Sequence, residues 1–423
     1  MNLQIRPLKN AVTETINIPG SKSYTNRSLI LAALTKGTVI LNNPLFSDDT
    51  NYLIDCLKVL GIKLIVSKNN IKVSGDISQI KEKKYDLNAQ LSGTTIRFML
   101  ALSCIIPGVK KIYGEEGLNK RPIKELVEGL RQLGAEIEYL EKEEFPPLLV
   151  KSSKLKEGVT KLKGDISSQY FSAILMIAPI IGGVTIQVLG KQISKPYIDM
   201  TIDTMEKFGV KVVNHNKKYL IKDGQKYLAK NYLVEGDYSS AGYFFAIAAL
   251  TKSKITVKNL NSKSKQADTR FLKILEEMGA KVIKGKDQIT IIGHGVKPVK
   301  VNMEDFPDQV QTLAVLASFA KGETIIDGIK SLRVKETERV KALQTELSKM
   351  GIRTESSENR LVIYGGNPRG VIIDTYNDHR MAMSFAIAGA KLGGVIIKNT
   401  EVVSKTFPDF WKILGKITKV QSI

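Results

Sequence analysis

Apolar and polar positions along this chain repeat at a nearly constant interval. Six times, a helix-like segment ends in a bulky apolar residue and a glycine, and a β-rich run follows. The glycines are Gly61, Gly134, Gly209, Gly279, Gly351 and Gly415, which are 73, 75, 70, 72 and 64 residues apart. A period of this length is too long for a solenoid repeat and fits a βαβ-type unit. The pattern therefore predicts six similar α/β units.

A second series of segments runs in phase with the glycines. Each is a mostly apolar helix that begins with a polar residue, at Ser21, Ser92, Ser167, Ser239, Asp308 and Asp378, with spacings of 71, 75, 72, 69 and 70. Helices that are apolar on all sides lie in a core. The polar first residues are also ordinary helix N-caps. We therefore expect six buried helices, one in each unit.

The two chain ends together supply one incomplete unit. Only 8 residues follow Gly415, whereas 20 residues precede Ser21 and contain two strand-like pieces, 3–6 and 13–18. We therefore expect residues 1 to about 19 to pair with the end of the chain. The six units then divide into two groups of three, which predicts one domain over 20–230 and a discontinuous second domain of 1–19 with 231–423.

Composition limits the classes of function. The net charge is +21 and the pI is about 9.6, but the lysines are spread along the chain without a basic run of five, which favours a solvated surface over nucleic-acid binding. The chain has no run of 18 apolar residues, so no membrane span is predicted. The first residues do not have the pattern of a signal peptide, so we expect a cytoplasmic protein. Cys56 and Cys104 fall among apolar neighbours and are expected to be buried, reduced thiols, and the three histidines have no metal-ligand spacing.

Cations stand at unusual places in these helices. Lys22, Arg27, Arg97 and Arg380 lie in or near first turns, where a positive charge opposes the helix dipole. It becomes favourable when an anion binds at the same helix end. The second helix series also begins with polar and cationic residues, among them Arg121, Arg339 and Lys405. We therefore expect an electropositive cleft between two domain faces that binds small ligands carrying phosphate and carboxylate groups.

Eight sequence blocks, in order along nearly the whole chain, resemble those of the 5-enolpyruvylshikimate-3-phosphate (EPSP) synthase family. They are PGSKSYTNRSL (19–29), SGTTIR (92–97), NKRPI (119–123), GDISSQYFSA (164–173), SKPYIDMT (194–201), RVKETER (333–339), TYNDHRMAMSFA (375–386) and SKTFPDF (404–410). The resemblance implies an α/β fold of the α+β type. It has two domains, each of three βαβαββ repeats, with buried parallel helices whose N-termini face the interdomain cleft. Leu91 departs from the family, which usually has Asn at that position.

The same resemblance implies an activity and its residues. The family transfers the enolpyruvyl group of phosphoenolpyruvate to the 5-hydroxyl of shikimate 3-phosphate, without a metal or organic cofactor. The residues implied as catalytic are Asp308, Glu336 and Lys22. Those implied for shikimate 3-phosphate are Lys22, Ser23, Arg27, Ser167, Ser168, Gln169, Ser194, Tyr197, Asp308 and Lys335. Those implied for phosphoenolpyruvate are Lys22, Gly93, Arg121, Gln169, Arg339, Arg380 and Lys405. We expect a monomer whose partners are these two small molecules, with neither nucleic acid nor membrane bound.

Three alternatives stay open from the residues alone. Asp308 could be only a helix cap, and Glu336 with Arg339 only a surface pair three residues apart. The sister enolpyruvyl transferases, which act on UDP-N-acetylglucosamine, usually carry a reactive cysteine in a glycine-rich loop, a setting that neither Cys56 nor Cys104 has. A polyanion-binding protein would show salt-dependent nucleic-acid affinity and no turnover. If the cleft exists, bound anions should close it at hinges near residues 19 and 230.

Overall fold

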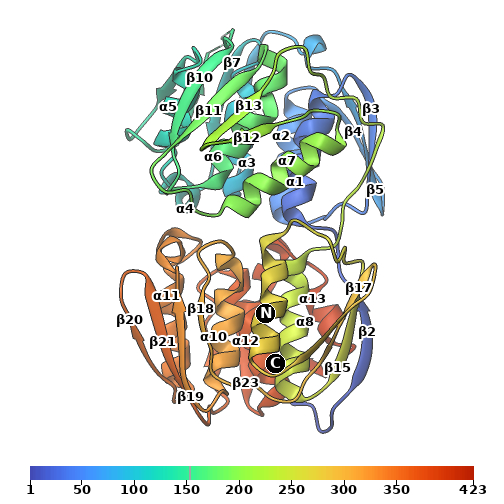
Figure 1. The fold of residues 1–423 in the computed structure, drawn as a ribbon, viewed down its shortest axis with the longest axis vertical. Coiled ribbons are helices and arrows are strands. Elements are labelled where there is room, and N and C mark those ends of the chain that lie inside the picture. The colour runs from blue at the N-terminus through green and yellow to red at the C-terminus, as the bar shows by residue number, and fades with distance from the viewer. Residues whose placement is uncertain (152–153) are drawn as a thin grey trace. The chain divides into compact units, whose positions relative to one another are not determined.

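The chain forms two compact units in a computed structural model, which describes residues 1–151 and 154–423. Unit 1 contains Met1–Pro19 and Glu235–Ile423, and unit 2 contains Gly20–Val234. In Figure 1, each unit has helices on its inside and small sheets around them. The units are described separately below.

Unit 2 contains three α/β repeats. Its elements, with η for a 3₁₀ helix, are α1 (Lys22–Leu34), β3 (Gly37–Asn42), α2 (Asp48–Val59), β4 (Lys63–Val66), β5 (Asn70–Gly75), η1 (Ile77–Gln79), β6 (Lys84–Asn88), α3 (Gly93–Ser103), β7 (Val109–Tyr113), α4 (Glu116–Asn119), α5 (Lys124–Arg131), β8 (Ile137–Tyr139), β9 (Leu148–Val150), β10 (Gly158–Lys163), α6 (Ser168–Ile177), η2 (Ala178–Ile181), β11 (Val184–Leu189), α7 (Lys195–Lys207), β12 (Val213–His215), β13 (Lys218–Ile221) and β14 (Asn231–Leu233).

Unit 1 contains the other three repeats. Its elements are β1 (Leu3–Ile5), β2 (Thr13–Asn17), α8 (Tyr238–Thr251), β15 (Lys254–Lys258), η3 (Ala267–Arg270), α9 (Phe271–Glu277), β16 (Lys281–Lys284), β17 (Gln288–Ile292), β18 (Lys300–Asn302), η4 (Pro307–Gln309), α10 (Val310–Ser318), β19 (Gly322–Asp327), η5 (Lys330–Val334), α11 (Arg339–Lys349), β20 (Arg353–Ser356), β21 (Arg360–Gly365), β22 (Ile372–Ile373), α12 (His379–Lys391), β23 (Val395–Ile397), η6 (Thr400–Lys405), α13 (Phe410–Leu414) and β24 (Val420–Ser422).

The sheets share one topology. In the order β10-β11-β13-β12, the first two strands are parallel and are joined through α6, and the last two form an antiparallel hairpin. The sheets β6-β7-β9-β8 and β18-β19-β21-β20 have the same order. A parallel pair needs a crossover connection, and in these three sheets the apolar helices α6, α3 and α10 provide it. The predicted α/β fold class is confirmed.

The N-terminal strands complete two sheets of unit 1. β1 lies between β23 and β24 and is antiparallel to both, with Ile5 opposite Val395 and Val420. The expected pairing of the N-terminus with the end of the chain is therefore correct for β1. It is wrong for β2, which runs parallel to β15 with Thr13 opposite Lys254. β14, the strand that leads into α8 and β15, pairs instead with β3 of unit 2. β2 therefore fills the position parallel to β15 that β14 leaves open.

The repeated glycine ends a helix in five of its six positions. Gly61 has φ +96°, its N–H donates to the Lys58 carbonyl (2.9 Å), and the Ile62 N–H donates to the Leu57 carbonyl (3.0 Å). Positive φ is adopted readily by glycine and is common just after a helix. The glycines with φ between +84° and +109° are Gly61, Gly134, Gly209, Gly279 and Gly351. Gly415 differs, because its φ of −60° continues the helical conformation of α13.

Two of the buried helices begin away from the predicted residue. α8 is capped by Asp237, whose carboxylate accepts from the Ser240 N–H (3.0 Å), so Ser239 lies inside the first turn. Asp308 lies in the 3₁₀ turn η4, and α10 begins after it at Val310. A proline at the start of η4 fixes φ in a helical range and starts this tighter turn first. The prediction that Ser239 and Asp308 begin these helices is therefore wrong.

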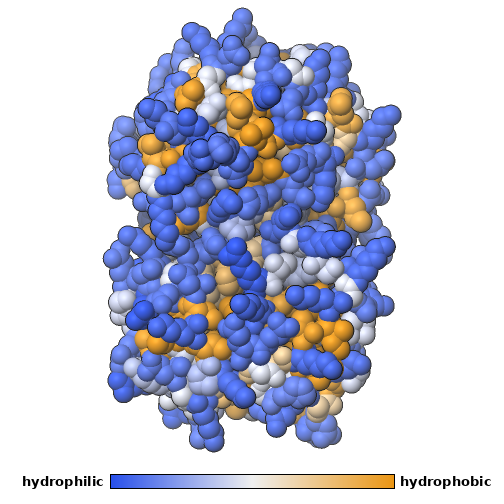
Figure 2. Space-filling view, viewed as in Figure 1, coloured by the Kyte–Doolittle hydropathy of each residue, from blue (hydrophilic) through white to orange (hydrophobic). Residues whose placement is uncertain are grey.

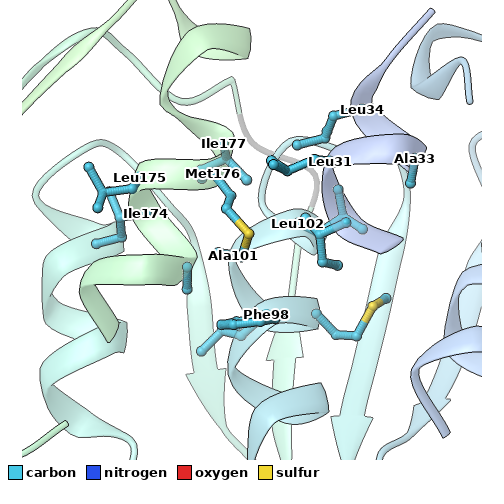
Figure 3. Packing of buried hydrophobic residues seen from close by; sticks show 14 of the residues in the cluster. Leu31, Ala33, Leu34, Phe98, Ala101, Leu102, Ile174, Leu175, Met176 and Ile177 are labelled. Atoms are coloured by element: carbon cyan, nitrogen blue, oxygen red, sulfur yellow. The ribbon is translucent and has the colours of Figure 1, made fainter. Parts of the chain in front are cut away.

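Each unit has its own hydrophobic core around three buried helices. In α1, every residue from Tyr24 to Leu34 is buried. Figure 3 shows side chains of α1, α3 and α6, among them Leu31, Leu102 and Met176, gathered in one cluster. α8, α10 and α12 form the corresponding core of unit 1. The face drawn in Figure 2 is mostly hydrophilic with separate apolar groups. The apolar helices are buried, as their pattern predicted.

Candidate active site

In unit 2, α1, α3 and α6 begin with polar residues that do not all cap their helices. Ser92 caps α3 by accepting from the Thr95 N–H, and Ser167 caps α6 by accepting from the Gln169 N–H, both at 3.3 Å. Ser21 precedes α1 without a side-chain cap bond. The N-terminal N–H groups of a helix favour anions. These helix ends are thus suited to bind negatively charged groups.

Lys22 is the first residue of α1 and pairs with a buried carboxylate. Its Nζ lies 3.0 Å from Asp49 Oδ2, and the Asp49 side chain is 4% exposed. A cation at a helix N-terminus is disfavoured by the helix dipole. Asp49 compensates for this effect and fixes the ammonium group at the start of α1. The expected functional Lys22 is therefore held by a partner that the sequence did not identify.

Two arginines approach the first turn of α3. A β-carbon placed on Gly93 would lie 3.2 Å from Arg97 Nη1 and 3.3 Å from Arg121 Nη1. Arg97 Nη1 donates to Gln169 Oε1 (2.6 Å), and Gln169 Nε2 donates to Thr94 Oγ1 (3.1 Å). Gly93, Arg121 and Gln169 are therefore brought together, with Arg97 between them. Arg97 is missing from the residues that the family resemblance implies, although its first-turn position was a signal for it.

Arg27 points into the core of unit 2. Its guanidinium donates to Thr201 Oγ1 (2.7 Å), the Tyr197 carbonyl (2.9 Å), the Ser23 carbonyl (2.9 Å) and Ser172 Oγ (3.3 Å). The residue is 2% exposed, and burial lowers the pKa of Arg27 to about 10. Arg27 joins α1, α6 and α7 in this structure, and its charge lies beneath the start of α1.

The remaining expected residues of unit 2 lie at the starts of α6 and α7. Ser167 is the N-cap of α6, and Ser168 is its first residue and is buried. Ser194 has φ +51° and precedes α7, where its carbonyl accepts from the Tyr197 N–H (3.1 Å). The backbone of Tyr197 also binds Arg27, which connects this turn to α1.

In unit 1, two arginines converge on Asp308. Arg380 Nη2 lies 2.7 Å from Asp308 Oδ2, and Arg339 Nη1 lies 3.4 Å from Asp308 Oδ1. Arg339 also binds Glu336 Oε2 (2.7 Å) and, through Nε, Asp378 Oδ2 (2.6 Å). Asp308, Glu336, Arg339 and Arg380 are therefore brought together at the starts of α10, α11 and α12.

In this cluster, two arginines contact three carboxylates, Asp308, Glu336 and Asp378. Arg339 is buried, and although burial by itself lowers its pKa, the charges of Asp378, Glu336 and Asp308 raise the pKa above the ordinary arginine value. Burial also raises the pKa of Tyr243, whose hydroxyl accepts from Arg380 Nη1 (3.3 Å), to about 12. An anionic ligand that binds the two guanidinium groups has to compete with these carboxylates, because like charges repel at close range.

The two expected lysines of unit 1 lie at the ends of two different 3₁₀ helices. Lys335 follows η5, and Lys405 is the last residue of η6. Both are partly exposed. His379 begins α12 and is buried beside Asp378, with Nδ1 3.7 Å from Asp378 Oδ1.

Other kinds of site find little support in the described part of the chain. Its His, Cys, Asp and Glu side chains form no group of three or more that could hold a metal ion. Among the helices described, each is too short or too polar to cross a bilayer. Burial raises the pKa of both the Cys56 and Cys104 thiols to about 12, which keeps them protonated.

Known proteins similar to this chain point to one family. The family model of EPSP synthase (3-phosphoshikimate 1-carboxyvinyltransferase) matches residues 8–414. The 3-phosphoshikimate 1-carboxyvinyltransferase of Shewanella sediminis is 41% identical over 416 residues, covering 97% of each chain. The enzyme of that name from Vibrio cholerae serotype O1 is 40% identical over 428 residues, covering 99% of this chain and all of the relative.

Solved structures share the fold. The structure of EPSP synthase from Acinetobacter baumannii matches with a TM-score of 0.83 at 25% identity, covering both chains completely. The enolpyruvyl transferase NikO from Streptomyces tendae matches with a TM-score of 0.79 at 17% identity, over 99% of this chain and 98% of NikO, which supports the fold alone. Because the family model and both relatives cover nearly the whole chain, this protein belongs to the EPSP synthase family.

Proposed function

We propose that this protein transfers the enolpyruvyl group of phosphoenolpyruvate to the 5-hydroxyl of shikimate 3-phosphate and releases phosphate, a step of aromatic amino acid biosynthesis. Relatives about 40% identical over the full length carry the name of this activity. The observation that carries the proposal is the Asp308 carboxylate, which lies between two guanidinium groups, 2.7 Å from Arg380 and 3.4 Å from Arg339. These cations favour the ionised carboxylate, the form that can accept a proton from a hydroxyl beside it.

In the proposal, unit 2 contributes residues that bind both substrates. Shikimate 3-phosphate binds through Lys22, Ser23, Arg27, Ser167, Ser168, Gln169, Ser194 and Tyr197. The helix starts of α1, α6 and α7 carry these residues, so N–H groups and hydroxyls can bind phosphate and ring hydroxyls together. Phosphoenolpyruvate uses Lys22, Gly93, Arg121 and Gln169. Gly93 matters because a side chain there would fill the space beside Arg121.

Unit 1 supplies the proposed acid–base groups and further cations. Asp308 and Lys335 bind shikimate 3-phosphate, whereas Arg339, Arg380 and Lys405 bind phosphoenolpyruvate. Guanidinium groups bind carboxylate and phosphate well because they offer parallel N–H donors, about 1.5–3 kcal/mol for each charged hydrogen bond. Arg339 is positioned for this by the buried Asp378.

The chemistry is an addition followed by an elimination. In the addition, the 5-hydroxyl oxygen bonds to C2 of phosphoenolpyruvate, Asp308 accepts the hydroxyl proton, and C3 gains a proton. In the elimination, the bond from C2 to the phosphate oxygen breaks, C3 loses a proton, and phosphate leaves. We assign the C3 proton to Lys22 and Glu336. The arginines stabilise the charge of the intermediate and of the leaving phosphate.

Three further statements belong to the proposal. We propose that the enzyme is a monomer, that its substrates are small molecules without a nucleic-acid or membrane partner, and that it acts in the cytoplasm. The spread of lysines along the chain and the biosynthetic role of its relatives support these statements. Sedimentation equilibrium would contradict the first if the mass exceeded that of one 46.8 kDa chain.

Phosphate release tests the proposed activity directly. Purified protein is mixed with phosphoenolpyruvate and either shikimate 3-phosphate or UDP-N-acetylglucosamine, and inorganic phosphate is measured. We expect release with shikimate 3-phosphate alone. Release with the sugar nucleotide alone would replace the proposed acceptor. Absence of release with both would refute the proposed activity.

A further inference from the structure

Another carboxyl group, outside the residues assigned so far, is bound to the first turn of α8. Asp268 lies in η3 and is 4% exposed. Ser239 Oγ donates to Asp268 Oδ1 at 2.8 Å. Gln266 lies two residues before Asp268, and its side-chain Oε1 accepts from the Tyr238 N–H at 3.0 Å. Two hydrogen bonds therefore fix η3 to the start of α8.

The same turn of α8 is bonded to the neighbour of Asp308. Gln309 Nε2 donates to the carbonyls of Ser239 (3.2 Å) and Tyr238 (3.3 Å), and Gln309 is fully buried. A continuous path of hydrogen bonds thus runs from Asp268 through Ser239 and Gln309 to the backbone beside Asp308. A shift of Asp268 would be transmitted along this path, because close-packed interiors transmit strain.

The charges around Asp268 favour its neutral form. Burial, together with the negative charges of Asp308 and Asp237, raises the pKa of Asp268 to about 7, although Arg380 and the hydrogen bond from Ser239 act to lower it. When two carboxyl groups share a desolvated region, one keeps a proton and the other stays ionised. Asp308 has the two guanidinium partners, so it is the group that stays ionised.

We propose that Asp268 is a positioning residue for Asp308. Asp268 holds a proton in the resting site, so that Asp308 keeps its negative charge between Arg339 and Arg380. This inference rests on the proposed function and adds a residue to it. Ionisation of Asp268 adds a negative charge that interacts with Arg380, one of the residues proposed to bind phosphoenolpyruvate. The efficiency of the enzyme with this substrate should therefore fall as the pH rises. The Ser239 hydroxyl keeps Asp268 in place in both states.

The kinetic test compares two variants of Asp268 with the native chain. kcat and kcat/KM for phosphoenolpyruvate are measured from about pH 6 to about pH 9, which brackets the Asp268 transition. We expect Asp268→Asn, which cannot ionise, to lose the part of the alkaline decline that the native chain shows near pH 7. We expect Asp268→Ala to lower kcat about 10- to 100-fold, because the hydrogen-bond path to Asp308 is broken.

Asp305→Asn is the matched control. Asp305 pairs with Arg270 of the same short helix η3, at 2.6 Å, but on the exposed side. We expect its pH profile to match that of the native chain. Superimposable profiles of native protein and Asp268→Asn would overturn the inference, as would an unchanged kcat in Asp268→Ala.

A stability measurement keeps this inference separate from the proposed function. A carboxyl group whose pKa is raised in the folded state stabilises the fold fully below its unfolded pKa and loses that contribution as the pH rises through the folded pKa. For one such group, the ratio of folded to unfolded native protein falls about tenfold per pH unit between the ordinary value of 3.8 and about 7. The Asp268→Asn variant lacks this term, so its stability relative to the native chain should rise over the same range. Equal pH dependence of stability in both proteins would overturn the inference, even if phosphate release proves the proposed activity. If the two proteins differ in this pH dependence but no phosphate is released, only the proposed activity is overturned.

Discussion

Replacing Arg339 by methionine should strongly destabilise unit 1. Arg339 is 1% exposed and binds the fully buried Asp378 twice, Nε to Oδ2 at 2.6 Å and Nη2 to Oδ1 at 3.3 Å. Methionine has a similar length without the charge. The substitution leaves Asp378 charged and buried, although its Oδ1 keeps the helix-cap bond from the Arg380 N–H at 2.8 Å.

The expected cost follows from this geometry. Removing one partner of a buried ion pair costs about 3–5 kcal/mol, mostly because the other charge stays without compensation. The double variant Arg339→Met with Asp378→Asn removes that uncompensated charge. It should therefore be more stable than the single variant by about 1–3 kcal/mol, the cost of a buried unsatisfied polar group. An exposed ion pair provides the comparison: Arg360 binds Asp327 at 2.7 Å on the surface of the same unit, and Arg360→Met should cost about 0–1 kcal/mol.

Urea unfolding followed by tryptophan fluorescence measures these differences. The chain contains one tryptophan, Trp411, which lies in unit 1. It packs against Phe410 with ring centroids 4.9 Å apart, and its Nε1 donates to the Thr400 carbonyl at 2.9 Å. Its signal therefore reports the unfolding of the unit that contains Arg339. Equal losses in Arg339→Met and Arg360→Met would refute the reasoning. So would a double variant no more stable than the single one.

Three other predictions concern catalysis, thiol reactivity and packing. Asp308→Asn should lower kcat for phosphate release about 100- to 10,000-fold, because the general base is lost, and more than a tenth of native activity would contradict the assignment. Cys56 and Cys104, whose thiol pKa values are raised by burial to about 12, should resist a thiol reagent near neutral pH in the folded protein and react in urea; fast labelling of the folded protein would contradict their burial. Gly389→Ala should cost about 1–3 kcal/mol in the urea assay because its β-carbon would lie 2.4 Å from Ile5 Cβ, and native-like stability would contradict this packing.

Much of the architecture could be predicted from periodicity alone. The interval between glycines and the six apolar helices depend on local sequence, since each repeat buries one helix against its own sheet. The missing strand of the last repeat could be located by counting residues, and β1 occupies it. Counting could not place β2, because both N-terminal strands satisfy the same pattern and its partner β15 lies far away in the sequence.

The candidate site was predictable in its residue types more than in its contacts. Cations in first turns indicated anion binding, and this signal included Arg97 even though the family motifs did not assign it. The partner of Lys22 could not be inferred, because Asp49 lies on a different helix. An acidic residue in the first turn of a helix is also common on a protein surface. The orientation of Arg27 into the core was equally invisible in the sequence.

The sequence by itself determined the repeat, the buried helices and the excess of positive charge, because these depend on patterns within one segment. Only the tertiary structure decided which charges meet. Arg339 binds Asp378, which is 39 residues away, and Asp268 is fixed to Ser239, which is 29 residues away. Such pairs form where helix starts that are distant in sequence converge, and burial then strengthens their interaction and shifts their protonation. The residue types of this site can be predicted from the sequence pattern, whereas their charge states depend on the contacts formed in the folded structure.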